Sequence, residues 1–188
     1  FPRPKDVLVA LEAVRKACRV TQALQPSNRE KTNATTVEKS DLSPVTVADY
    51  AVQALVLYHL SKQFPYDGFI AEEDSASLRE NNALCQQVRS AAGLSEPDTL
   101  QGIDLGKSYT QWKEDRPSRV WCLDPIDGTR GFLRGKEQGG QYCIALALVE
   151  DGIPTVGILG CPNLPVQVND EQYAWAVDES EENNAQRR

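Results

Sequence analysis

The first clear pattern along the chain is a helical repeat near its start. Apolar residues recur at intervals of four, three and four positions: Val7, Leu11, Val14 and Cys18. That spacing places them on one face of an α-helix and predicts a helix over residues 5–24. Glu12 and Lys16 lie four residues apart and are expected to pair on its solvent-facing side.

A second helix is predicted from near Thr46 to about Gln63. The residues expected on its buried face are Val47, Ala51, Leu55 and Tyr58. Between the two helices, residues 25–43 are polar and rich in Pro, Asn and Thr, which predicts a loop. The short apolar run of residues 68–71 predicts a buried strand, and a weaker helical pattern follows over residues 77–91.

Strand patterns dominate the second half of the chain. Residues 141–149 are apolar and β-prone, Asp151-Gly152 is a two-residue turn signal, and residues 153–160 are again β-prone, so an antiparallel hairpin is predicted. Residues 119–123 predict a further strand, and residues 172–177 could add another. Mixed helices and strands with an antiparallel component favour an α+β fold over a doubly wound parallel sheet.

Composition narrows the classes of function. The chain has 188 residues, enough for one domain with its own core. Acidic side chains outnumber basic ones 27 to 20, giving a net charge of −7. Proteins that coat nucleic acids or anionic membranes normally carry a basic surface, so neither is expected as a partner. The single histidine, His59, excludes zinc sites built from two or three histidines.

The cysteines and the chain ends add little chemistry. Five cysteines without a CxxC pair are expected to be free thiols in a reducing compartment. Because the sequence has no methionine, Phe1 is not expected to be a translation start, so a leader has been removed or the chain is an excerpt. A cytoplasmic location is expected, with an organelle as the alternative. Residues 178–188 are polar and predict a solvated tail.

Acidic motifs stand where predicted elements begin or end, which is where functional sites are usually built. Asp49 lies at the start of the second predicted helix, where Thr46-x-x-Asp49 also fits a helix-capping box. Glu72-Glu73-Asp74 directly follows a predicted strand. Adjacent carboxylates repel unless a cation lies among them or all face water. For both motifs, a purely structural role stays open at this point.

The third acidic motif is Asp124-Pro125-Ile126-Asp127-Gly128-Thr129. Pro125 fixes φ and Gly128 permits a tight turn, so the two aspartates can converge at a strand end. The amides after Gly128 and the Thr129 hydroxyl are typical of a turn that accepts phosphate. Carboxylates for a hard cation beside amide donors for an anion are what metal-assisted phosphoryl hydrolysis requires.

Together these motifs resemble those of the magnesium-dependent, lithium-sensitive phosphomonoesterases, a family that includes inositol monophosphatase. Within that family, residues 128–135 and 160–164 resemble the 3′(2′),5′-bisphosphate nucleotidases. The similarity runs from the first helix to about Pro165. It implies an α+β, layered α/β sandwich of the sugar-phosphatase type, of which this chain carries the N-terminal part.

The resemblance also implies roles for single residues. The Mg²⁺ ligands would be Glu72, Asp124, Asp127 and the backbone carbonyl of Ile126. Asp49 and Thr129 would form a hydrogen-bonded pair that orients and deprotonates the attacking water. The amides of Gly128 and Thr129 would hold the scissile phosphate. The implied substrate is a small molecule, 3′-phosphoadenosine 5′-phosphate, which would be hydrolysed to AMP and phosphate without a covalent intermediate.

Members of the family are considerably longer than this chain. Residues 1–165 are therefore expected to be a metal-binding catalytic domain. Residues 166–188 would begin the connection to an absent second domain or form a polar tail. The absent part would supply another aspartate ligand and grip the adenine, so weak metal binding and an exposed apolar face are expected here. Two alternatives stay open: an inositol-phosphate or sugar-phosphate phosphatase, and a non-catalytic scaffold.

Overall fold

The computed structural model describes residues 4–26, 36–38, 44–111 and 117–165. The predicted strand at 172–177, the polar tail and the expected connection at 166–188 lie outside these residues. In chain order the elements are α1 (Pro4–Leu24), β1 (Thr36–Glu38), β2 (Pro44–Thr46), α2 (Val47–Gln63), β3 (Gly68–Ala71), α3 (Ala76–Glu80), α4 (Asn82–Ala92), α5 (Glu96–Asp104), η1 (Leu105–Lys107), α6 (Ser108–Gln111), β4 (Arg119–Asp127), α7 (Thr129–Arg134), η2 (Lys136–Gln138), β5 (Cys143–Glu150) and β6 (Ile153–Gly160).

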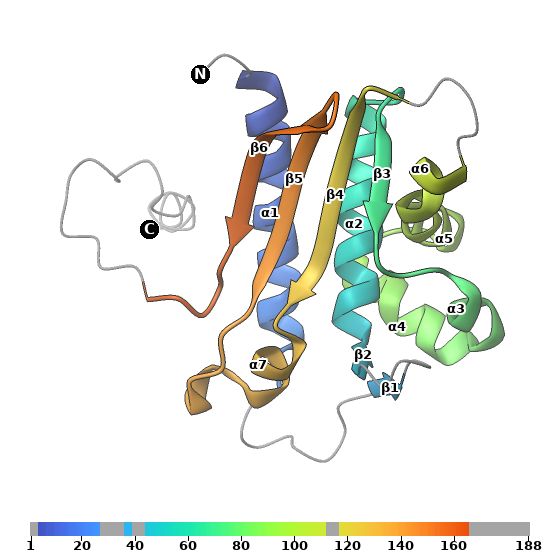
Figure 1. Cartoon of the computed structure of the whole chain (residues 1–188). Coiled ribbons are helices and arrows are strands. Elements are labelled where there is room, and N and C mark those ends of the chain that lie inside the picture. The colour runs from blue at the N-terminus through green and yellow to red at the C-terminus, as the bar shows by residue number, and fades with distance from the viewer. Residues whose placement is uncertain (1–3, 27–35, 39–43, 112–116, 166–188) are drawn as a thin grey trace, which may run out of the picture.

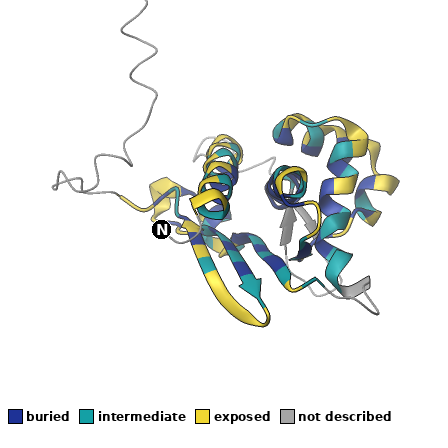
Figure 2. Ribbon diagram, turned by 90° about the horizontal axis from the view of Figure 1, so that it is seen from above, coloured by how far each residue is buried: buried dark blue, intermediate teal, exposed yellow. Residues whose placement is uncertain are grey.

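A mixed four-stranded sheet forms the centre of the molecule, in the order β3-β4-β5-β6. β3 runs parallel to β4, whereas β4, β5 and β6 pair antiparallel. The long helices α1 and α2 lie on one side of this sheet (Figures 1 and 2). The predicted α+β class is confirmed, and so is the β5–β6 hairpin. In contrast, Thr36–Glu38 is a strand paired with β2, where the sequence predicted only loop.

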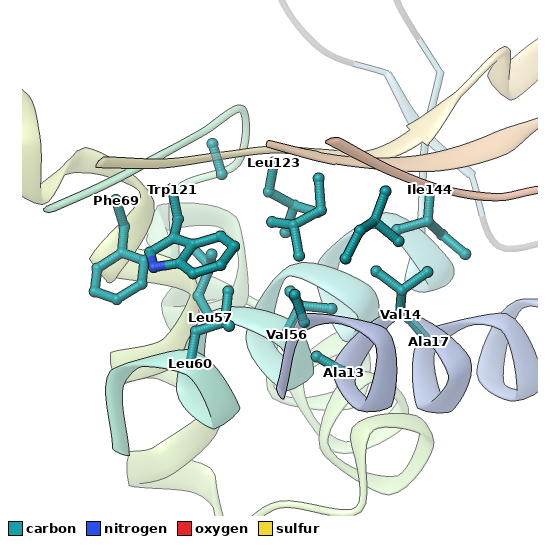
Figure 3. Close-up of a cluster of buried hydrophobic side chains, with 14 of the residues drawn as sticks. Ala13, Val14, Ala17, Val56, Leu57, Leu60, Phe69, Trp121, Leu123 and Ile144 are labelled. Atoms are coloured by element: carbon teal, nitrogen blue, oxygen red, sulfur yellow. The ribbon is translucent and has the colours of Figure 1, made fainter. Parts of the chain in front are cut away.

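The main core fills the space between the sheet and the two long helices (Figure 3). Trp121 on β4, Leu57 on α2 and Ala17 on α1 are each 0% exposed. Full burial of a side chain of the size of Leu57 stabilises the fold by roughly 1.5–3 kcal/mol relative to exposure. This layer fixes the positions of the strand ends on which the candidate site depends.

The buried face of α1 differs from the predicted one. Its buried residues are Ala10, Ala13, Val14, Ala17 and Thr21. Val7, Leu11 and Cys18 are only half-buried. Helix α1 contacts α2 as well as β5 and β6, and its alanines lie in one core cluster with apolar residues of α2, a neighbour that the apolar spacing alone does not reveal. The approach to β6 is also close: a Cβ added to Gly160 would lie 2.6 Å from the Val14 Cγ1 and the Cys18 Sγ of α1.

Helix α2 is buried almost all round, although the sequence predicted a single buried face. It is covered by the sheet on one side and by α4 and α5 on the other. Helix α5 was not predicted at all, although Ser95 at its start accepts a hydrogen bond from the Asp98 amide at 3.3 Å. A Cβ added to Gly102 would lie 2.5 Å from the carbonyl oxygen of Ala54, so α5 packs against the α2 backbone.

The predicted helix over residues 77–91 is interrupted. Asn81 adopts an extended conformation, with φ −124° and ψ 93°, and separates α3 from α4. Its side chain accepts a hydrogen bond from the Leu84 amide at 3.0 Å, which caps the second helix. The apolar spacing predicts helix on both sides of residue 81, but it does not reveal that Asn81 ends one helix and caps the next.

Three large apolar residues on and just beyond β6 are exposed. Ile153 and Leu159 on β6 are 65% and 68% exposed, and Leu164 just beyond the strand is 58% exposed. Within the described residues, the structure contains no helix with the length and apolar character needed to cross a membrane.

Candidate functional site

Three of the predicted acidic residues, Glu72, Asp124 and Asp127, lie at the ends of two neighbouring strands. In the parallel pair β3–β4, Ala71 lies opposite Leu123, so Glu72 and Asp124 come next on adjacent strands. Such strands lie about 4.8 Å apart. Ala71 and Leu123 are buried in the core beneath the sheet, whereas Glu72 is exposed and Asp124 half-buried. The alternation of side chains along a strand directs residue 124 to the face away from the helices.

A β-bulge brings the second aspartate to the same face. Asp124 pairs with Ala145 and Asp127 pairs with Cys143, so three steps along β4 correspond to two steps along β5. In a regular strand, residues three apart point to opposite faces. The extra residue in the bulge reverses that alternation and re-aims the later side chain. Asp124 and Asp127 consequently lie on one face, opposite residues that are themselves two apart.

The thiol of Cys143 lies beside these aspartates. Its Sγ donates a weak hydrogen bond to Asp127 Oδ2 at 3.8 Å. Burial, followed by the charges of Asp127, Cys161 and Asp124, raises the pKa of Cys143 to about 11. With no cation beside it, the thiol is therefore protonated at neutral pH. The donors at this edge are oxygens, which suit a hard cation such as Mg²⁺.

The turn after Asp127 has the predicted shape. Gly128 has φ +86°, a left-handed conformation that glycine adopts without strain. Its carbonyl accepts hydrogen bonds from the amides of Gly131 and Phe132, at 2.7 Å and 3.1 Å, as α7 begins. Thr129 Oγ1 donates to the carbonyl oxygen of Ile126 at 3.2 Å. Two residues that the sequence assigned to the site are thus in direct contact.

Asp49 lies in the first turn of α2 and is only 6% exposed. The preceding residue, Ala48, packs in a small apolar cluster with Ile126, Phe132 and Tyr142. This cluster joins the start of α2 to the bulge on β4 and to the helix after the Gly128 turn. Asp49 is consequently anchored in the part of α2 that packs against the acidic strand end.

Gln53 is a positioning residue that the sequence analysis missed. It is 0% exposed, and its Nε2 donates to the carbonyl oxygens of Glu73 and Ile103, both at 2.8 Å. Its Oε1 accepts from the Glu73 amide at 2.9 Å, so both backbone polar groups of Glu73 are satisfied. Lys107 Nζ also donates to the Glu72 carbonyl at 2.8 Å. The sequence does contain one indication of this role: Gln53 is a polar residue between the apolar residues Val52 and Ala54.

The ligand set itself remains a prediction. Within the described ranges, no group of three or more His, Cys, Asp or Glu side chains is arranged so that it could hold a metal ion. The backbone register and the oxygen chemistry support Glu72, Asp124 and Asp127 as ligands. The roles assigned to Ile126 in metal binding and to the Asp49–Thr129 pair also remain predictions.

Comparison with known proteins gives a consistent result. A model of the inositol monophosphatase family matches residues 5–184. The chain is 42% identical over 179 residues to a 3′(2′),5′-bisphosphate nucleotidase of Emericella nidulans, covering 86% of this chain and 47% of that protein. It is 39% identical over 173 residues to a protein of the same name in Schizosaccharomyces pombe, covering 86% and 48% respectively.

Solved structures show the same fold. An extragenic suppressor protein suhB from Bartonella henselae aligns with a TM-score of 0.54 and 20% identity, covering 84% of this chain and 45% of that one. An IMPase from Thermotoga maritima aligns with a TM-score of 0.53 and 21% identity, covering 87% and 45% respectively. The chain spans about half the length of the curated relatives it matches.

Proposed function

The chain belongs to the inositol monophosphatase family, and we propose that it carries the metal-binding site of a Mg²⁺-dependent phosphomonoesterase. The proposed reaction is hydrolysis of 3′-phosphoadenosine 5′-phosphate to AMP and phosphate. One observation carries this proposal: the bulge that turns Asp124 and Asp127 onto one face, beside the strand end that leads to Glu72.

The proposed ligands are Glu72, Asp124, Asp127 and the carbonyl oxygen of Ile126. When bound, Mg²⁺ lowers the pKa of a coordinated water and neutralises charge on the phosphoryl oxygens. The chain supplies the framework for this chemistry: the β-pairing of Asp124 and Asp127, and the Gln53 and Lys107 hydrogen bonds to the backbone of residues 72 and 73.

Asp49 and Thr129 are proposed to handle the proton of the attacking water. Asp49 would accept a hydrogen bond from the Thr129 hydroxyl, which in the structure donates to the Ile126 carbonyl oxygen. Thr129 Oγ1 would then accept a hydrogen bond from that water and direct it toward phosphorus. The Gly128 and Thr129 amides would bind the phosphate oxygens. In this proposal, charge is stabilised by preorganised donors that need no rearrangement during the reaction.

The names of the curated relatives support an adenosine bisphosphate substrate. The fold of a solved IMPase supports a second candidate, an inositol-phosphate phosphatase. Because the chain spans only about half the length of these relatives, the proposed activity refers to the metal site.

Phosphate release by the 188-residue chain, with each of the two substrates at millimolar Mg²⁺, tests the proposal. Release from 3′-phosphoadenosine 5′-phosphate that is lost on chelation is expected, with only a modest preference over inositol monophosphate because the chain spans about half the length of its relatives. Asp127→Asn is expected to lower Mg²⁺ affinity by at least about tenfold in calorimetry. The matched control is Asp151→Asn in the hairpin turn, which removes one carboxylate far from the bulge.

Two results would reject parts of this assignment. Preference for inositol monophosphate would favour the second candidate. Absence of Mg²⁺ binding in calorimetry, with the protein folded by circular dichroism, would reject the metal site and favour a non-catalytic scaffold.

A further inference from the structure

Two cysteines stand opposite each other where β5 and β6 end beside the candidate site. The antiparallel register pairs Ile144 with Gly160. One step further along each strand, the next residues are Cys143 and Cys161. Both are free thiols and both are half-buried. Continued by one residue beyond the last paired position, this register sets the two oxidisable residues opposite each other.

Hydrogen bonds beyond the cysteines show that the two segments stay side by side. Gln141 Nε2 donates to the Asn163 carbonyl oxygen at 3.3 Å. Asn163 is 4% exposed and donates through Nδ2 to the Gly140 carbonyl oxygen at 2.8 Å. The pair is thus bracketed by the Ile144–Gly160 pairing on one side and by the Asn163 contacts on the other.

The spacing of opposed residues suits a disulfide. Directly opposite residues of an antiparallel pair have Cα atoms about 4.5–5.5 Å apart. That range lies within the roughly 4.4–6.8 Å found between disulfide-bonded residues. The charge of Cys161 also contributes to the raised pKa of Cys143, which agrees with two thiols lying close together.

We propose that Cys143 and Cys161 form a reversible cross-strand disulfide when the protein meets a low-molecular-weight disulfide such as oxidised glutathione. One thiolate attacks the glutathione disulfide and releases one glutathione thiol. The other cysteine then attacks the mixed disulfide and releases the second. One protein S–S bond forms, the protein loses two electrons and two protons, and one glutathione disulfide becomes two glutathione thiols.

The proposed disulfide would change the surroundings of Asp127. In the reduced protein, the Cys143 thiol donates to Asp127 Oδ2. A disulfide has no S–H group, so oxidation removes this donor and ties β6 to the strand that pairs with the bulge. If Asp127 binds Mg²⁺, as the proposed function holds, oxidation is expected to change Mg²⁺ affinity.

Cys18 on α1 is the competing partner for Cys161. Burial, followed by the charge of Cys161, raises the pKa of Cys18 to about 11, so these thiols also lie near each other. However, the Cys18 Sγ lies 2.6 Å from the position of a Cβ added to Gly160. Gly160 therefore faces α1, and strand alternation directs its neighbour Cys161 away from that helix. This geometry favours Cys143.

Peptide mapping can separate these pairings. A protease that cleaves after glutamate leaves each of the five cysteines in its own peptide; the cuts that separate Cys143 from Cys161 and from Cys122 follow Glu150 and Glu137. The chain is incubated with oxidised glutathione, its remaining thiols are alkylated, and the peptides are identified by mass. The expected result is one linked pair, 138–150 with 151–171, which dithiothreitol separates.

Variants make the result decisive. Cys161→Ser is expected to abolish the linked pair, and Cys18→Ser is expected to leave it unchanged. Cys85→Ser is the control for loss of one thiol elsewhere. A Cys18–Cys161 link, or five alkylated cysteines after oxidation of a folded chain, would overturn the proposal.

A second measurement tests the coupling to the metal site alone. Mg²⁺ titration of the oxidised and reduced proteins is expected to show an affinity change of at least about threefold, absent in Cys161→Ser. If the mapped disulfide forms but the affinity stays equal, the coupling is wrong while the disulfide stands. If neither redox form binds Mg²⁺, the proposed function fails while the mapping result is unaffected.

Discussion

The two ends of strand β4 gather carboxylates in different ways. At its start, Arg119 binds Asp67 through Nε at 3.1 Å, Glu150 through Nη1 at 2.8 Å and Asp6 through Nη2 at 3.1 Å. Burial opposes the charge of Arg119, but its hydrogen bonds to Asp67 and Asp6 outweigh this and raise its pKa. One guanidinium thus joins α1, the sheet and the turn before β3.

At the opposite end of the same strand, the positions of the acidic residues are set by backbone pairing and not by an arginine. The register aligns Glu72 with Asp124, and the bulge turns Asp127 to the same face. Here the chain places carboxylates near a thiol that they help to keep protonated. Carboxylates therefore stabilise the fold at the end where an arginine joins them, whereas at the other end the proposed function assigns them to a bound cation.

Replacing Arg119 is expected to give the largest loss of stability. It tests whether the carboxylates at the start of β4 are structural. Arg119→Met leaves Asp67, which is 9% exposed and also accepts from Trp121 Nε1, without its guanidinium. Loss of one partner from a buried ion pair costs about 3 kcal/mol, so urea unfolding should show a decrease of that order. Arg15→Met on the exposed side of α1 is the control. An equal decrease in both would refute the special role of Arg119.

The second largest loss of stability is expected at Gly131 in α7, close to the candidate site. A Cβ on Gly131 would lie 1.8 Å from the carbonyl oxygen of Gln141, a backbone atom that cannot move aside cheaply. Gly131→Ala is therefore expected to destabilise the chain by about 2 kcal/mol in urea unfolding. Gly157→Ala, where nothing lies within 4 Å, is the matched control. A neutral result at Gly131 would mean that α7 and the segment before β5 separate easily.

At the acidic end, removing a charge is expected to act in the opposite direction to Arg119→Met. Asp127→Asn relieves repulsion with Asp124 and should raise stability without Mg²⁺ by about 0.5 kcal/mol. It should also abolish the rise in melting temperature that Mg²⁺ gives the unaltered chain. Thermal unfolding with and without Mg²⁺ measures both effects. Destabilisation by this substitution would show that Asp127 is a structural residue like Asp67.

The smallest effect concerns His59 on α2, whose Nε2 lies 3.8 Å from Glu12 Oε2 on α1. Burial, followed by the charge of Lys16, lowers the pKa of His59 below its ordinary 6.5, although Glu12 opposes the shift. The unfolded chain then binds the proton more readily, so this group reduces stability as pH falls from about 7 to 5. His59→Gln should lose less stability than the unaltered chain over that range. Parallel stability curves would contradict this account.

Local patterns in the sequence were sufficient for several elements. The hairpin was predicted because strand-forming runs flank an Asp-Gly turn, and α1 because its apolar spacing is regular. The buried face of α1 differs from the predicted one because the helix packs against α2 as well as against the sheet. Helix α5 was missed because its sequence is mostly polar and its burial depends on contact with α2. Gln53 was missed because its partners are distant in sequence.

The sequence by itself determined which chemistry is available: acidic residues at strand ends, a glycine turn after Asp127, and one histidine in the whole chain. Only the tertiary structure decided how these residues face one another. Spacing in sequence gives Asp124 and Asp127 opposite orientations on a regular strand, and the pairing of β4 with β5 is what imposes the bulge and reverses one of them. Side-chain direction on a strand depends on hydrogen bonds to a partner strand, and those partners are fixed only when the sheet assembles.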